Sequence, residues 1–276
     1  MFDLFAIARG NALVIEERFE VVVAGMGAQE AALAREFASW VETEALISIN
    51  VPSFVVGELL AGRACQNTYE LAGELAAVSG RPAEDILRER LKDHYERRIA
   101  FDGAFNGGQN FRYGALNAGG PGLTQQYDPY CVVLKRTYQD TLTDLAYLPG
   151  DSLKICFGGA GASLDEDAVR RSPAPHSHRH VLVAIERAAE VPTSDKHEWP
   201  KLVAPEGRYF EVIFVGEVLL EAVECVRALK TEIKRMRELE FANFGRKLDP
   251  GERALADDFV VLRRGALEGK LRLEEV

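Results

Sequence analysis

The chain carries Phe111-Arg112-Tyr113-Gly114-Ala115-Leu116-Asn117, a run whose apolar and aromatic residues predict a strand with one arginine in it. A loop with glycines and prolines follows, and residues 130–137 (YCVVLKRT) then predict a second strand. Residues 208–215 (RYFEVIFV) predict a third strand, which carries an acid. The sequence thus places Arg112 and Glu211 on separate strands that are far apart along the chain.

Around these strands the sequence predicts an α+β protein. Residues 1–104 are expected to form a mainly helical region, and residues 105–276 a strand-rich domain that ends in helices. Residues 11–24 are an exception in the first region, because their β-branched run predicts an extended segment. The helices expected in that region span residues 29–44, 53–60, 68–77 and 82–100. The second region adds strands at 152–157 and 180–186 and helices at 219–244 and 250–264.

The composition excludes several classes of function. The 276 residues include 33 basic and 43 acidic side chains, a net charge of −10, which argues against binding to nucleic acid or to an anionic membrane. No apolar run is long enough to span a bilayer, and the N-terminus lacks the lysines of a classical signal peptide. The four cysteines are widely spaced, which predicts reduced thiols, synthesis in a cytoplasm and no cysteine-based metal site.

Four segments together resemble a set of bacterial proteins of unknown function, which in turn look like the ADP-ribosyltransferase toxin superfamily. The segments are residues 112–117 (RYGALN), 127–134 (YDPYCVVL), 149–152 (PGDS) and 209–216 (YFEVIFVG). The resemblance covers about residues 106–220 and implies a split β-sandwich for the strand-rich domain. It also implies an enzyme: a mono-ADP-ribosyltransferase that moves ADP-ribose from NAD, its substrate, to a protein side chain without a metal.

The resemblance further implies roles for individual residues. Arg112 is expected to hold the diphosphate or ribose of NAD through its planar guanidinium. Ser152 is expected to steady the ribose or the acid. Glu211 is expected to bind a ribose hydroxyl and to stabilise the positive charge that develops as the bond to nicotinamide breaks. The other positions expected to contact NAD are Tyr113, Gly114, Asn117 and Tyr209.

The serine element and the catalytic acid depart from the superfamily's pattern. A single serine, Ser152, stands where other members have a Ser-Thr-Ser run, and Thr141 and Thr143 lie upstream as alternatives. Glu217, just past the third strand, is an alternative to Glu211. Structural explanations also stay open, namely an ion pair for the acid and a helix cap for the serine.

The side chain that would accept ADP-ribose is also left undetermined, since Tyr209 occupies a position that is often glutamine or glutamate in the superfamily. Certain secreted effectors of the superfamily modify threonine of ubiquitin, and the resemblance admits this acceptor. A protein made in a bacterial cytoplasm and delivered into a host cell would fit such a role. The alternative to an enzyme is an interaction module that retained the fold and lost the chemistry.

Two further chemistries use residues outside these motifs. His176, His178 and His180 alternate, so a strand would place all three on one face, where they could bind a metal. A loop that leads into the next strand is the favoured alternative. Cys131 together with one of these histidines could form a thiol hydrolase, although a small buried thiol is the usual explanation for a cysteine in such a strand.

Overall fold

The computed structural model describes residues 1–276 with the exception of 124–126, 160, 206 and 243–247. The chain is a mixed α+β protein whose residues group into two compact units. Unit 1 comprises Met1–Ala45, Gln66–Ala118 and Leu142–Gly216, and unit 2 comprises Leu46–Cys65, Gly119–Thr141 and Glu217–Val276. Each unit thus combines segments from both sides of residue 105, where the sequence suggested a domain boundary.

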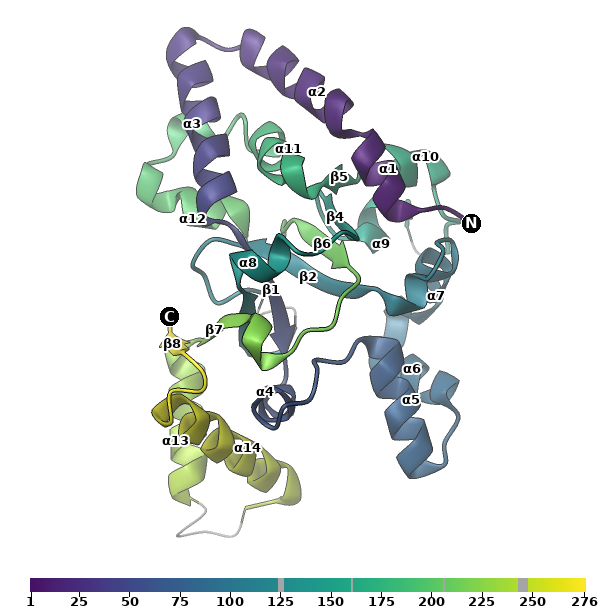
Figure 1. The fold of residues 1–276 in the computed structure, drawn as a ribbon, viewed down its shortest axis with the longest axis vertical. Coiled ribbons are helices and arrows are strands. Elements are labelled where there is room, and N and C mark those ends of the chain that lie inside the picture. Colours follow the sequence, from purple (N-terminus) through teal and green to yellow (C-terminus); the bar gives the residue numbers. More distant parts are fainter. Residues whose placement is uncertain (124–126, 160, 206, 243–247) are drawn as a thin grey trace. The chain divides into compact units, whose positions relative to one another are not determined.

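Among its described residues, unit 1 contains four strands in the order β5-β4-β6-β2 (Figure 1). Their bounds are β2 Arg112–Asn117, β4 Leu145–Leu148, β5 Ala174–Pro175 and β6 Glu211–Phe214, and neighbouring strands are antiparallel. β6 therefore forms hydrogen bonds to β2 on one side and to β4 on the other. The strands predicted around Arg112 and Glu211 are confirmed, although the second is shorter than expected, whereas β4 was not predicted.

The helices of unit 1 come from all three of its segments. They are α1 Leu4–Gly10, α2 Ala12–Ala24, α3 Ala28–Glu44, α5 Thr68–Ser79, α6 Ala83–Leu91, α7 Tyr95–Gly103, α9 Ser152–Ile155, α10 Glu166–Arg171, α11 Arg179–Glu186 and α12 Trp199–Val203. Short 3-10 turns lie at Lys92–His94, Gly108–Asn110, His176–His178, Val191–Thr193 and Lys196–Glu198. The helix predicted at 82–100 is divided into α6 and α7 by the first of these turns.

Three segments that were predicted as strands are helical instead. Residues 11–24 form α2, in which Ile15, Phe19 and Val23 are buried at a spacing of four residues, so the β-branched run follows a helical period. Residues 180–186 belong to α11, whose residues 181–184 are all buried. A short, continuously apolar run of this kind fits a buried helix as well as a strand. Residues 152–157 begin with α9, whose N-cap is Asp151.

The described part of unit 2 contains four strands in the order β1-β3-β7-β8. The strands are β1 Leu46–Val51, β3 Tyr130–Leu134, β7 Val223–Ala228 and β8 Leu273–Glu275, and only the pairing of β7 with β8 is parallel among these. The helices are α4 Ser53–Leu60, α8 Arg136–Gln139, α13 Lys230–Ala242 and α14 Pro250–Leu267, with a 3-10 turn at Leu220–Ala222. The prediction of one helix over 219–244 is wrong in its first part, because Val226 pairs with Val132 in the sheet; its end lies outside the described residues.

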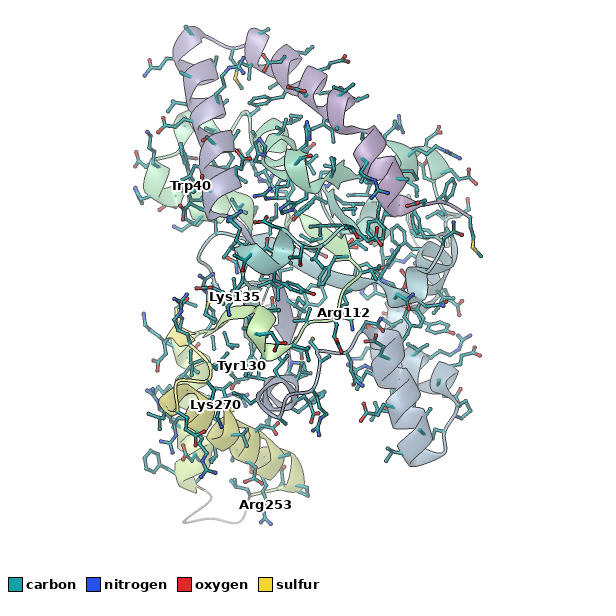
Figure 2. The ribbon with its side chains drawn as sticks, viewed as in Figure 1. Trp40, Arg112, Tyr130, Lys135, Arg253 and Lys270 are labelled. Carbon is teal, nitrogen blue, oxygen red and sulfur yellow. The ribbon has the colours of Figure 1, made fainter. Side chains whose placement is uncertain are left out.

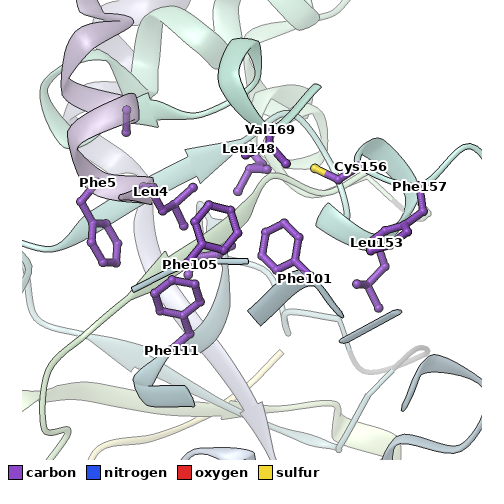
Figure 3. Close-up of a cluster of buried hydrophobic side chains, with 13 residues drawn as sticks. Leu4, Phe5, Phe101, Phe105, Phe111, Leu148, Leu153, Cys156, Phe157 and Val169 are labelled. Atoms are coloured by element: carbon purple, nitrogen blue, oxygen red, sulfur yellow. The ribbon is translucent and has the colours of Figure 1, made fainter. Parts of the chain in front are cut away.

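A core of aromatic side chains in unit 1 connects α7 to the strands (Figure 3). The ring centroids of Phe101 and Phe105 are 4.9 Å apart, and those of Phe105 and Phe111 are 5.7 Å apart. Leu148 at the end of β4 and Leu153 in α9 belong to the same cluster. The cluster therefore packs together α7, α9, the end of β4 and the residue before β2, which are the elements that carry the candidate site.

Gly108 makes a close approach between two of these elements possible. A Cβ at this position would lie 2.0 Å from the carbonyl oxygen of Asp102, which is a backbone atom. No side chain fits in that space without a shift of the backbone. A glycine is thus required where the turn Gly108–Asn110 packs against the end of α7.

Candidate active site around Glu211

Glu211 is the first residue of β6 and lies between two strands. Its Cα partner is Ala115 on β2 and Leu148 on β4. The side chain is 3% exposed, so its carboxylate needs polar partners inside the protein. The Oε2 atom accepts a hydrogen bond from the backbone N–H of Ser152 at 2.9 Å, and Oε1 lies 3.8 Å from Nη2 of Arg98.

Ser152 reaches Glu211 because α9 begins directly after β4. Asp151 is the N-cap of α9, and its side chain accepts the N–H of Leu153 at 2.9 Å. This leaves the N–H of Ser152, in the first turn of the helix, available for the carboxylate. The Ser152 hydroxyl accepts a hydrogen bond from Nη1 of Arg98 at 3.4 Å. The structure thus brings together two of the residues that the sequence predicted for the site.

Arg98, on α7, supplies the positive charge next to Glu211. Its guanidinium carbon lies 3.8 Å from the centre of the Tyr113 ring, and its Nη1 lies 3.8 Å from Oδ1 of Asp102. Its side chain is 13% exposed. Stacking on Tyr113 orients the planar guanidinium so that it contacts a carboxylate on its own helix and one on β6.

Asp102 is the second buried carboxylate of the site. It is 2% exposed and lies one turn after Arg98 on α7. Its Oδ2 accepts the hydroxyl of Tyr69 at 2.8 Å, and its Oδ1 accepts the hydroxyl of Tyr113. Tyr113 therefore contacts both charged groups of α7, through its ring to Arg98 and through its hydroxyl to Asp102.

Burial dominates the electrostatics of the site. It raises the pKa of Glu211 to about 7, against the opposing effect of Arg98; the negative charge of Asp151 adds to the rise. Burial also raises the pKa of Asp102, and Arg98 and the two tyrosine hydroxyls oppose it. The pKa of the Tyr113 phenol is raised well above its usual value for the same reason. Glu211 therefore exchanges its proton near neutral pH, as a general acid or base must.

Arg112 lies on the other face of the strands from Glu211. It pairs with Phe214, while Glu211 pairs with Ala115, three positions further along β2. Arg112 (labelled in Figure 2) is 9% exposed, and its Nη2 donates to Oε2 of Glu70 at 2.7 Å. The structure therefore does not bring Arg112 to the carboxylate of Glu211, and a carboxylate of α5 contacts its guanidinium.

Of the other residues expected to contact NAD, some share the strand face of Glu211 and others lie on the opposite face or outside the strands. Gly114 has the same alternation as Arg112 and pairs with Val212, on the face away from Glu211. Asn117 has the alternation of Tyr113 and is 1% exposed. Tyr209 is 3% exposed and precedes β6 by two residues. Of this group, Tyr113 has a described contact with the residues around Glu211, through Arg98.

Sequence reasoning missed Arg98, Asp102 and Tyr69. Arg98 and Asp102 are separated by four residues on a helix, a spacing that places them on one face. An acid and an arginine at this spacing are common on exposed helix faces, so the pattern gave no sign that both are buried. Tyr69 gave no signal beyond its place in a predicted helix.

The alternative acid and the alternative serine element lie in other surroundings. Glu217 is exposed, and its backbone carbonyl accepts the hydroxyl of Tyr138 at 2.7 Å. Thr141 and Thr143 are exposed as well. All three residues are therefore more accessible to solvent than Glu211.

The histidine and cysteine chemistries receive no support from the geometry. His176 and His178 form part of a 3-10 turn and His180 lies on α11, so the alternation of a strand does not apply. His176 forms a hydrogen bond through Nδ1 to the hydroxyl of Tyr147 at 2.8 Å. Within the described part of the chain, no three His, Cys, Asp or Glu side chains come together as a metal-binding group. Cys131 is completely buried in β3.

Comparison with known proteins adds no family. A scan against protein-family models, a search of curated proteins and a search of solved structures each found no match. Among the residues that the structure describes, no helix combines the length and apolar character needed to cross a membrane.

Proposed function

We propose that the chain is a mono-ADP-ribosyltransferase that transfers ADP-ribose from NAD to a protein side chain. The observation that carries this proposal is the hydrogen bond between Glu211 on β6 and Ser152 at the start of α9. β6 carries the acid, β4 leads directly into the serine, and β2 carries the arginine motif, in the order β4-β6-β2. Three of the four segments that resemble the superfamily, residues 112–117, 149–152 and 209–216, thus come from neighbouring elements of unit 1, whereas residues 127–134 belong to unit 2.

The chemistry that we propose centres on the carboxylate of Glu211. The glycosidic bond between the ribose and nicotinamide breaks, and nicotinamide leaves with the electron pair. The acceptor oxygen or nitrogen then bonds to the anomeric carbon and loses its proton. An ionised carboxylate beside the ribose stabilises the positive charge that develops on the ribose between these two steps, as in glycosidases. The N–H of Ser152 orients this carboxylate, which is supported by its 2.9 Å hydrogen bond.

In this proposal the guanidinium next to the reacting carboxylate is that of Arg98. Arg98 lies 3.8 Å from Glu211 and can attract the diphosphate of NAD, whereas Arg112 is paired with Glu70. Arg112 can contribute to NAD binding only where the diphosphate displaces the carboxylate of Glu70. The half-exposed side chain of Glu70, 44% accessible, is compatible with such an exchange.

The finer fold and the biological setting belong to the same proposal. The split β-sandwich implied by the resemblance is part of it, beyond the mixed α+β fold that the structure shows. The acceptor is a protein, with threonine of ubiquitin as one candidate, and neither nucleic acid nor a membrane is a partner. The setting is a bacterial toxin or effector made in the cytoplasm and delivered to a host.

A second candidate function is an interaction module without chemistry. The burial of Glu211 and the ion pair between Arg112 and Glu70 favour it, because both are features of a structural charge network. Isothermal titration calorimetry with NAD separates the two candidates. The transferase binds NAD, whereas a module that has lost the site gives no heat of binding.

The proposed transferase is tested by nicotinamide release from NAD, measured on the purified chain with and without a eukaryotic cell lysate. Glu211→Gln keeps the size and polarity of the side chain and removes its charge. We expect it to reduce release by at least about 100-fold, the loss typical for removal of a group that stabilises transition-state charge. Glu217→Gln is the matched control, because Glu217 is exposed and lies six positions further on; it should retain the wild-type rate.

Other outcomes decide against parts of the proposal. Loss of release in Glu217→Gln with full release in Glu211→Gln would move the site to Glu217 and keep the reaction class. The absence of both nicotinamide release and NAD binding in the wild-type chain would exclude the transferase. In that case the interaction module becomes the better explanation.

A further inference from the structure

Arg98 is shared between two buried carboxylates that come from different elements. Its Nη1 lies 3.8 Å from Asp102 on α7, and its Nη2 lies 3.8 Å from Glu211 on β6. The two carboxylates are 2% and 3% exposed, respectively, so solvent screens neither of them strongly. One positive charge therefore faces two potential negative charges in a region of low dielectric.

Asp102 holds Arg98 through a closed ring of contacts. The hydroxyl of Tyr113 donates to Asp102, and the ring of Tyr113 lies under the guanidinium of Arg98 at 3.8 Å. Arg98 completes the ring through its own contact with Asp102. The hydroxyl of Tyr69 donates to the other oxygen of Asp102, which fixes the plane of the carboxylate. None of these contacts involves Glu211, so Asp102 and the tyrosines can set the place of Arg98 independently of β6.

We propose that Asp102 is a positioning residue of the site, which fixes Arg98 between the two carboxylates and so limits the charge that Arg98 offers to Glu211. The importance of Asp102 for the reaction rests on the function proposed above. The effect of Asp102 on Glu211 does not rest on that function, because it follows from the contacts of the protein alone. When Asp102 is ionised, its negative charge partly offsets the positive charge of Arg98, so Glu211 keeps its proton to a higher pH. Without that negative charge, Arg98 acts on Glu211 alone.

The effect has a defined direction. A neutral residue at position 102 removes a nearby negative charge and leaves the positive charge of Arg98, and both changes favour the ionised form of Glu211. The other groups that act on Glu211 stay in place; they are Ser152, Asp151 and Cys156 around α9 and Tyr113 on β2. We therefore expect the pH midpoint of Glu211 to fall by about one pH unit.

The test is a titration of the Glu211 carboxyl carbon by NMR in the intact chain labelled with carbon-13 glutamate. The signal is assigned by its absence in Glu211→Gln. Asp102→Asn removes the charge and keeps one of the two side-chain oxygens, so one tyrosine hydroxyl keeps its acceptor. Asp93→Asn is the matched control, since Asp93 is an exposed acid in the turn that precedes α7. We expect the midpoint to move down in Asp102→Asn and to stay in Asp93→Asn.

An unchanged or raised midpoint in Asp102→Asn overturns the inference. If Asp102→Asn does not fold, Tyr69→Phe gives a milder test in the same direction. The Tyr69 hydroxyl favours the ionised form of Asp102, so its loss reduces the negative charge that opposes Arg98 and the Glu211 midpoint should fall; a rise or no change overturns the inference. The titration needs no NAD. A wild-type chain that neither binds NAD nor releases nicotinamide thus refutes the proposed function, while the midpoint still decides the role of Asp102.

Discussion

Ala115 on β2 is the Cα partner of Glu211 on β6. Residues that face each other across antiparallel strands project to the same side of the sheet, and residues an odd number of positions away project to the other. Arg112, three positions before Ala115, therefore projects away from the Glu211 carboxylate. The arginine that meets this carboxylate, Arg98, comes from a helix rather than from the predicted strand.

Exchanging each arginine for glutamine should separate their roles. Arg98→Gln leaves two buried carboxylates without their cation and should lower the free energy of unfolding by about 3–5 kcal/mol at alkaline pH. Arg112→Gln removes an ion pair to a half-exposed acid and should cost about 1 kcal/mol. Urea denaturation of both variants at the same pH measures the difference. Nicotinamide release should fall further in Arg98→Gln, and the reverse order would return the NAD site to Arg112.

The stability of the wild-type chain should depend on pH through Glu211. Its pKa in the folded protein is about 7, above the value of 4.5 that it has when unperturbed. The folded state therefore binds the proton more tightly, so the contribution of Glu211 to stability is present below pH 4.5 and is lost as the pH rises through about 7. The loss amounts to about 3 kcal/mol. Glu211→Gln cannot titrate and should lack it.

Denaturation curves of wild type and Glu211→Gln at about pH 5 and pH 8 measure this effect. The difference in free energy between the two proteins should shift in favour of Glu211→Gln at the higher pH. Glu217→Gln, with an exposed acid exchanged, should follow the wild type at both values. Parallel behaviour of wild type and Glu211→Gln would show that Glu211 titrates in its ordinary range.

Gly108 and Gly103 form a matched pair around α7. A Cβ at Gly108 would lie 2.0 Å from the carbonyl oxygen of Asp102, whereas a Cβ at Gly103 would meet nothing within 4 Å. Gly108→Ala should therefore destabilise the protein by several kcal/mol, because the backbone must move. Gly103→Ala should be neutral or stabilising by up to about 1 kcal/mol, since it replaces a helical glycine. Thermal unfolding of the two variants checks the contrast, and equal melting temperatures would contradict it.

Asn67 should contribute to the stability of α5 and of its first-turn contacts. Its side chain accepts the N–H groups of Tyr69 and Glu70 at 2.9 Å each, and its Nδ2 donates to the carbonyl of Gln109 at 3.1 Å. Asn67→Ala should cost about 1–2 kcal/mol. Asn67→Asp is the control, because it keeps an acceptor oxygen for the two N–H groups while losing the donor to Gln109, and it should recover part of this loss. Chemical denaturation of the two variants provides the comparison. Equal losses in the free energy of unfolding would show that the helix cap contributes nothing to stability.

The sequence predicted the elements whose pattern is local. The strand predicted at residues 111–117 and the helices predicted at 29–44 and 68–77 have a clear period, and the structure confirms them as β2, α3 and α5. The β-branched run at 11–24 was misjudged, because Ile15, Phe19 and Val23 satisfy a helical spacing that their β propensity concealed. Propensity is a weak guide when the same residues can be buried in either conformation.

The candidate site was predictable only in part, because its motifs are local in sequence but its contacts depend on tertiary packing. Glu211 and Ser152 were found through motifs, and their contact joins residues 59 positions apart in sequence, which only the pairing of β4 with β6 brings together. Arg98 could not be identified, because an arginine on a helix has the same appearance in the sequence whether it faces solvent or a buried acid. Its selection depends on the packing of α7 around Phe101, a tertiary property.

Tyr69 and Glu70 are consecutive residues, yet one binds Asp102 and the other binds Arg112. The first turn of α5 is thus tied to Asp102 on α7 and to Arg112 on β2, so any opening of the helical hairpin α5–α6 releases two polar contacts at once. By thermodynamic linkage, a ligand that displaces either contact makes the hairpin open more easily, and a protein that captures the open hairpin changes the affinity for that ligand by the same factor. Hydrogen exchange of the α5 backbone amides would measure the free energy of opening the hairpin and how a ligand changes it.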